Sequence, residues 1–245
     1  MAPRRAISER DATTMTGKIP FICAVLLASL SLHAEQFWLT QGALFNATDS
    51  LRLSLYNTVY MEHGEQFSNE VAPGFRWQFA KNWSAGAGMT FTQNRRKSEE
   101  VTDDGETVIH HHWAMGSRPS ENVALDWTGK CGNWNFFDSN RIYMYFRKDE
   151  RDWAVYRNIF TVTAPAIPSA PCNPRPYLMQ QVYFTGRDGY DGLDRFSQFR
   201  TTAGLRLRPL ECLSLAAYWQ YRDIEQKTGD WYQVRIVGVS ATMMF

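Results

Sequence analysis

Histidines are the first residues of this sequence that could carry chemistry, because an imidazole can bind a metal or act as a general base near neutral pH. His110, His111 and His112 stand together, and on a strand His110 and His112 would share one face. Two imidazoles are fewer than the ligands that zinc sites use, and no cysteine or carboxylate follows at a recognisable spacing. The cluster is therefore interpreted as the polar end of a strand.

A Ser–His hydrolase would have to use one of these three histidines or His63 as its base, since the remaining histidine, His33, lies in the segment that we expect to be removed. No G-x-S-x-G motif accompanies them. We therefore expect no enzyme activity, and we assign no catalytic, cofactor-binding or metal-binding residues and no cofactor.

Two polar segments could bind ligands but fit solvated loops better. Asp188, Asp191 and Asp194 resemble a calcium loop, yet their spacing of three does not match the alternating oxygen ligands of an EF-hand. Residues 94–107 mix basic and acidic side chains. We expect the first segment to be a glycine-containing turn, and the second to be an exposed loop that faces the medium or lipopolysaccharide.

The elements that would position such residues have a period of two. In residues 51–61, leucine, valine and methionine alternate with arginine, serine and tyrosine, and residues 83–92, 199–208 and 213–222 alternate in the same way. Turn signals divide the chain into about a dozen candidate strands, with a rigid proline-rich loop at 164–176. A face that carries so many charged residues cannot form a dry core.

Composition excludes two broad classes of protein. The chain has 245 residues, 44% of them hydrophobic and 14% aromatic, with a formal net charge of +1. A mean hydropathy of −0.40 and a single long apolar run exclude a polytopic helical membrane protein, whose spans need about 20 apolar residues each. The near-neutral charge argues against nucleic acid as a partner.

Residues 1–34 are predicted to be a secretory signal peptide. The apolar run 19–34 follows Lys18 and ends in small residues, so cleavage is expected after Ala34. Met15 is a candidate for the true start, because it would shorten an unusually long polar leader. Cys23 lacks the context of a lipid-modified cysteine. Residues 35–245 are expected to form one domain.

Alternation alone fits a soluble lipocalin-like barrel as well as a membrane barrel, in which the apolar face points outward. The export signal, the aromatic residues at strand ends and the final apolar strand that ends at Phe245 favour the membrane barrel. The expected girdle comprises Trp38, Tyr60, Trp77, Trp83, Trp153, Trp219 and Trp231. We predict an all-β fold, a single closed antiparallel transmembrane β-barrel of about 10–12 strands and even in number.

Arginines and tyrosines are predicted to crowd the interior of this barrel. The inward set comprises Arg52, Arg76, Arg141, Arg147, Arg200, Arg206, Arg208, Arg222, Tyr56, Tyr60, Tyr143, Tyr145 and Tyr218. Long side chains would leave a narrow or occluded lumen in so small a barrel, with the arginines paired to carboxylates. Their excess positive charge suggests, as a hypothesis, selection of small anions.

Three cysteines remain after the predicted cleavage. Cys131 and Cys172 lie in turn-like contexts and are the better candidates for a disulfide, while Cys212 would be left over. Three free thiols are equally compatible with the sequence.

Several segments together resemble domain of unknown function 2490, a family of bacterial outer-membrane β-barrels without an assigned activity. The resemblance covers nearly all of residues 35–245, although 180–184 lacks the acidic residue that such proteins often carry there. It is carried by residues 35–38, 140–147, 153–158 and 200–245. It implies a fold and a location, and it supplies no functional residue.

The expected function is therefore that of an outer-membrane barrel with a structural role or a narrow, occluded channel for small solutes. The alternatives are a membrane-embedded lipid-modifying enzyme, either a hydrolase or an acyltransferase, and a soluble periplasmic lipocalin-like binding protein. Expected partners are outer-membrane lipid, lipopolysaccharide and the barrel-assembly machinery, which would bind the strand that ends at Phe245. The protein is expected to be a monomer.

Overall fold

The computed structural model describes residues 34–101, 107–115, 119–145, 153–168, 170, 172–186, 195–225 and 230–245. Residues 1–33 lie outside this part, so the signal peptide stays a prediction. Asp188, Asp191, Asp194 and Arg147 also lie outside it. No helix within the described ranges is long and apolar enough to cross a membrane.

The described chain is built from β-strands. In chain order they are β1 (Gln36–Asn46), β2 (Leu51–Glu62), β3 (Glu65–Ala80), β4 (Trp83–Val101), β5 (Thr107–Met115), β6 (Ser120–Cys131), β7 (Trp134–Tyr145), β8 (Trp153–Thr163), β9 (Arg175–Thr185), β10 (Arg195–Leu210), β11 (Leu213–Glu225) and β12 (Trp231–Met244). This confirms an all-β fold with about a dozen strands. Of the segment 164–176 that was predicted to be a loop, residues 164–168, 170 and 172–174 lie outside strands, between β8 and β9, whereas 175 and 176 begin β9.

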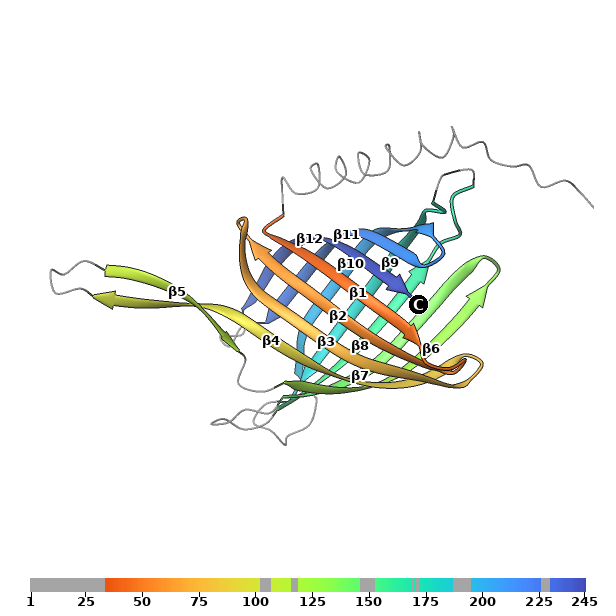
Figure 1. Ribbon diagram of the computed structural model, residues 1–245, viewed down its shortest axis with the longest axis horizontal. Coiled ribbons are helices and arrows are strands. Elements are labelled where there is room, and N and C mark those ends of the chain that lie inside the picture. Colours follow the sequence, from red (N-terminus) through yellow and green to blue (C-terminus); the bar gives the residue numbers. More distant parts are fainter. Residues whose placement is uncertain are drawn as a thin grey trace, which may run out of the picture.

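Eleven of these strands close into a barrel (Figure 1). β1, β2, β3, β4 and β6–β12 pair in sequence, each antiparallel to the next, and β12 then pairs with β1. The closing pair is parallel, with Phe37 opposite Val237. Successive hairpin strands reverse direction, so an odd number leaves the first and last strands parallel. The prediction of an even, fully antiparallel barrel is therefore wrong in this respect.

β4 explains the odd number. It is 19 residues long, and its first half pairs with β6 from Trp83 to Thr90, within the barrel. From Gln93 onward it pairs with β5 instead, so that the two strands leave the barrel as a ribbon (Figure 1). The prediction of an irregular loop is wrong for residues 94–101, because their backbone groups pair with a second strand despite the mixed charges.

The two ends of the barrel differ. The end that holds the turns 47–50, 81–82, 132–133 and 211–212, together with the carboxyl end of β12, is called the Phe245 rim below. The opposite end, where β1 begins, is called the Gln36 rim. At the Gln36 rim, β2 and β3 are joined by His63 and Gly64, whose φ angles of 49° and 82° are those of a type I′ hairpin turn.

Apolar side chains face outward and polar ones face the enclosed space. Leu55 on β2 is 51% exposed, whereas Asp126 on β6 and Thr202 on β10 are 1% and 0% exposed. The outward set includes Phe45, Leu53, Val71, Phe75, Met89, Val123, Leu125, Ile142, Phe160, Leu178 and Met243. This confirms the predicted orientation of the alternating strands.

Aromatic residues stand at both rims, but Trp38, Tyr60 and Trp219 of the expected girdle do not. Trp219 lies in the middle of β11, and the side chain of Trp153 is not among those that the structure describes. Trp83 and Trp134 are exposed near the Phe245 rim, and Trp231 is exposed at the Gln36 rim. Trp38 is only 8% exposed and points inward, where its ring meets Tyr60 edge-on at 5.0 Å between centroids. Trp38 and Tyr60 therefore fill the interior, and their assignment to the girdle is wrong.

One polar cluster lies on the outer wall. Asp138 on β7 alternates with the lumen-facing Ser139, so it points outward. Its two carboxylate oxygens accept hydrogen bonds from Asn158 Nδ2 at 2.7 Å and Asn140 Nδ2 at 3.1 Å. Tyr156 donates its hydroxyl to Asn140. Because these groups satisfy one another, the cluster is tolerable on an otherwise apolar face.

Inward tyrosines lie over glycines of the neighbouring strand. A Cβ at Gly42 on β1 would lie 2.6 Å from a ring carbon of Tyr56 on β2, and a Cβ at Gly238 would collide with the ring of Tyr218. Each pair is directly opposite in the sheet register. The missing side chain lets the aromatic ring lie against the wall, as in the aromatic rescue of glycines.

Gly238→Ala is expected to lower the free energy of unfolding by about 1–3 kcal/mol, because its methyl group overlaps the ring of Tyr218. Urea unfolding followed by tryptophan fluorescence measures the effect. Combining Gly238→Ala with Tyr218→Ala removes the overlap, so the double variant should lose less than the sum of the two single variants. Additive losses would contradict this contact.

Candidate functional site

The half of the lumen nearer the Phe245 rim is open. Three cavities of about 1190, 770 and 190 Å³ lie there, and Tyr56 lines all of them. We call this space the chamber. Its arginine lining comprises Arg52, Arg76, Arg141, Arg157, Arg175, Arg206 and Arg208.

Alternation along the strands brings these side chains together. Arg52 and Tyr56 lie on the inner face of β2, and Arg206 lies on the inner face of β10, at even spacing from Thr202. Arg52, Arg76, Arg141 and Arg206 all act electrostatically on the hydroxyl of Tyr56. Four guanidinium groups from four strands therefore surround a single tyrosine.

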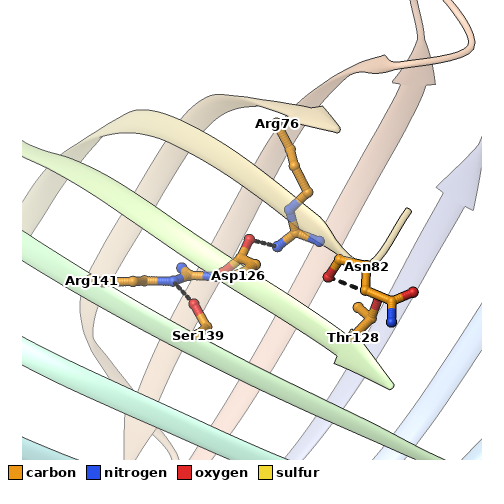
Figure 2. A network of polar contacts seen from close by, with 6 residues as sticks. All are labelled: Arg76, Asn82, Asp126, Thr128, Ser139 and Arg141. Carbon is orange, nitrogen blue, oxygen red and sulfur yellow. Dashed lines mark hydrogen bonds and ion pairs between the residues drawn. The ribbon is translucent and has the colours of Figure 1, made fainter. Parts of the chain in front are cut away.

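Arg76 and Asp126 form an ion pair across the chamber wall (Figure 2). Arg76 Nη2 lies 2.8 Å from Asp126 Oδ2, although β4 separates β3 from β6. Gly86 of β4 is paired with Arg76 on one side and Ala124 on the other. The small residue facing inward at this position leaves room for Arg76 to reach over β4. Arg76 is 40% exposed, whereas Asp126 is almost fully buried.

Arg141 stands beside this pair but binds a neutral partner. Its Nε donates to Ser139 Oγ at 3.0 Å on the same strand, β7 (Figure 2). Arg206 lies over the ring of Tyr177 at 5.3 Å, and Arg52 donates to Asn46 Oδ1 at 2.9 Å. Of the predicted inward arginines, Arg76 alone is ion-paired with a carboxylate among the described residues. The expectation that the arginines would pair with carboxylates is therefore wrong for the others that the structure describes, whereas Arg147 lies outside the described residues.

Large side chains pack the other half of the lumen, toward the Gln36 rim. Trp38, Val234 and Ile236 form a buried cluster at the seam between β1 and β12, and Tyr60 and Ile224 pack against it. Across the lumen, Val155, Tyr183, Gln181, Gln198 and Gln220 are also buried. These packed side chains bound the chamber on the side of the Gln36 rim, and they are called the floor below.

Several residues of this interior escaped the sequence analysis, among them Arg157, Arg175, Tyr177 and Tyr183. Arg157 alternates with Val155 and Ile159, and all three residues of β8 face inward. The outward face of β8 mixes Phe160 with Tyr156 and Asn158. When both faces of a strand mix apolar and polar residues, alternation gives no sign of which one points inward.

The histidines are not brought into this chamber. His63 lies in the turn between β2 and β3, and His110, His111 and His112 lie on β5, which pairs only with the outer part of β4. Among the described residues, no group of three or more His, Cys, Asp or Glu side chains could hold a metal ion. Cys131, Cys172 and Cys212 are all free thiols, so the suggested disulfide between Cys131 and Cys172 is not formed.

Comparison with known proteins gives neither a family nor a role. No family model matches the chain, and no curated protein matches it. Among solved structures, the β-domain of the Bordetella autotransporter BrkA is similar over 77% of this chain and 82% of that chain, with 11% sequence identity and a TM-score of 0.46. Those values are too low to transfer any residue or activity. The resemblance to domain of unknown function 2490 stays a prediction.

Asp126→Asn is expected to lower the free energy of unfolding by about 1–3 kcal/mol, because Arg76 loses the carboxylate that balances its charge in the wall. Urea unfolding of the folded barrel measures the change. Glu65→Gln is the matched control. It removes an ion pair with Arg95 in which the glutamate is 69% exposed, so its effect should stay below about 1 kcal/mol. Equal losses in both variants would contradict the structural role of Asp126.

Proposed function

We propose that the protein is an outer-membrane β-barrel whose occluded lumen receives small anionic solutes in the chamber at its Phe245 rim. In this proposal the lumen is not an open pore, because the buried side chains of the floor fill its other half. Passage of a solute to the other side would require the floor side chains to move. The chemistry that recognises the solute is the excess of guanidinium groups over carboxylates around Tyr56.

This proposal rests on the burial pattern of the chain, in which apolar side chains face outward and polar ones face inward. Leucines, valines and phenylalanines cover the outer wall, while arginines, serines, threonines and glutamines face the enclosed space. In water such a wall would expose a large apolar surface, interrupted by the polar cluster around Asp138. In a bilayer the same wall faces acyl chains, and rims with tryptophans lie where the lipid headgroups begin. A soluble lipocalin-like protein needs the opposite arrangement, with apolar residues inside.

The connections between strands support one orientation in the membrane. The Phe245 rim holds two-residue turns after β3, β6 and β10, beside the longer connection between β8 and β9. Short turns are typical of the periplasmic end of an outer-membrane barrel. The chamber would then open to the periplasm. Phe245 is 62% exposed at this rim, which supports the expected contact with the barrel-assembly machinery.

Leu55→Arg tests the bilayer directly. In a membrane the variant should lose about 2–4 kcal/mol of folding free energy in lipid vesicles, because a guanidinium would lie near the middle of the hydrocarbon. Leu210→Arg, at the Phe245 rim, is the control and should lose at most about 1 kcal/mol. The measurement is urea unfolding in vesicles, together with the faster migration of the unboiled protein on a denaturing gel. A soluble protein would tolerate both substitutions equally, since both leucines are exposed.

Conductance tests the packed floor. The unmodified protein is expected to show no stepwise current in planar bilayers, and the double variant Trp38→Ala, Ile236→Ala is expected to show a small one, since both side chains fill the floor. In a salt gradient, the reversal potential of that current should indicate a preference for anions. Trp219→Ala, on the outer wall, should stay silent. A large steady current from the unmodified protein would contradict an occluded lumen.

A further inference from the structure

We propose that the floor of the chamber holds a site for one compact oxyanion, such as phosphate or sulfate, between Arg157, Arg200 and Arg222. This deepens the proposed function and rests on it, because the chamber supplies the entrance to the site. The following paragraphs derive the site from charge, from unsatisfied donors and from access.

Three guanidinium groups gather here from three strands. Arg200 on β10 stands directly opposite Arg222 on β11 in the register, and both are on inward faces. Arg157 on β8 and Arg200 lie over the same ring, that of Tyr183, at 5.1 and 4.8 Å from its centroid. Like charges placed directly opposite on neighbouring strands repel each other. A protein keeps such a pair when something negative lies between them.

The protein itself supplies too little negative charge. None of these three arginines is ion-paired with a carboxylate of the described residues. Glu70 acts electrostatically on Arg157, and it already accepts a hydrogen bond from the hydroxyl of Tyr60 at 3.0 Å. One carboxylate against three guanidinium groups leaves a net positive charge in a packed region, where burial of uncompensated charge is costly.

The hydrogen-bond inventory points to the same deficit. Arg157 donates to Gln181 Oε1 at 2.6 Å, and Arg222 donates to Gln198 Oε1 at 3.0 Å, so the amide oxygens are already used. Buried donors remain that find no acceptor among the described residues: the Nε atoms of Arg157, Arg200 and Arg222 and the Nε2 atoms of Gln198 and Gln220. Gln198 and Gln220 are 8% and 2% exposed. Unsatisfied buried donors of this number call for an acceptor.

The chemistry of the ligand follows from these donors. It must be negative, it must present only acceptors, and it must be small enough for a packed floor. Guanidinium groups bind phosphate, sulfate and carboxylate through paired N–H donors, and Arg is the residue best suited to such forked contacts. A free anion reaches the site through the chamber, since Arg157 also lines the cavity of about 1190 Å³. A lipid phosphate on the outer wall would have to cross that wall.

The test uses the full chain folded in detergent micelles, with inorganic phosphate as the probe and ionic strength held constant with chloride. Isothermal titration calorimetry should show one saturable site, and sulfate should compete for it. Arg200→Gln and Arg222→Gln should each weaken phosphate binding about tenfold or more. Arg235→Gln, outside the lumen, is the matched control and should change it less than about twofold.

Thermal unfolding separates a binding role from a structural one. Without phosphate, Arg222→Gln should raise the midpoint, because it relieves repulsion with Arg200. With phosphate, the unmodified protein should gain stability, as a ligand that binds only the folded state requires, and the variant should not. Equal destabilisation of Arg222→Gln in both buffers would overturn the site.

The outcomes also separate this proposal from the proposed function. A folded barrel that inserts into vesicles and binds neither phosphate nor sulfate refutes the oxyanion site alone. Phosphate binding that depends on Arg200 and Arg222, in a protein that fails to insert into vesicles, refutes the membrane barrel alone.

Discussion

The pairing of β1 with β12 is the interaction on which the rest of the structure depends. It gives every strand of the wall two neighbours, so no backbone edge of the barrel is left unpaired. In a closed wall each side chain points either outward or into the lumen. A shift of the register by one residue would move every side chain of a strand to the opposite face, so the two sets stay separate. With leucines and phenylalanines outside, the wall is stable only against an apolar surrounding, and the enclosed space must be filled by what remains. Closure therefore determines both the solvent that the protein needs and the polar character of its interior.

Long polar side chains must fit into the small cross-section of the interior. Glycines at positions such as 42 and 238 let the tyrosines of the next strand lie against the wall. Arginines use aromatic faces, serine and glutamine as partners, and these satisfy hydrogen bonds without cancelling charge. Only the pair of Arg76 with Asp126 neutralises an interior arginine within the described residues. The positive charge of the lumen is thus a consequence of how the space is filled, and any anion that enters finds donors already in place.

Where each face of a strand has its own character, the sequence predicts the structure well. β2, β10 and β11 carry arginine, serine or tyrosine on one face and leucine or alanine on the other, so their inward residues, Arg52 and Arg222 among them, could be named in advance. β8 mixes apolar and polar residues on both faces, which hides Arg157. Trp38 was misplaced because an aromatic residue near a strand end fits a girdle and an interior cluster equally well. The number of strands in the barrel depends on where β4 leaves the wall. That point is set by the pairing of β4 with β6 and then with β5, and a local sequence pattern does not predict such long-range pairing.

The guanidinium groups of the chamber and those of its floor have different surroundings, so the two halves of the lumen are not equivalent. Near the mouth, the arginines line open cavities, where water screens them and their combined field attracts anions from a distance. At the floor, the guanidinium Nε atoms are buried beside glutamines that are almost fully covered, so the same charge acts at short range and with little screening. Under the proposed function, an anion moving inward exchanges water for protein donors step by step. The order of the residues along β10, with Arg206 at the mouth and Arg200 at the floor, places both stages on one inner face.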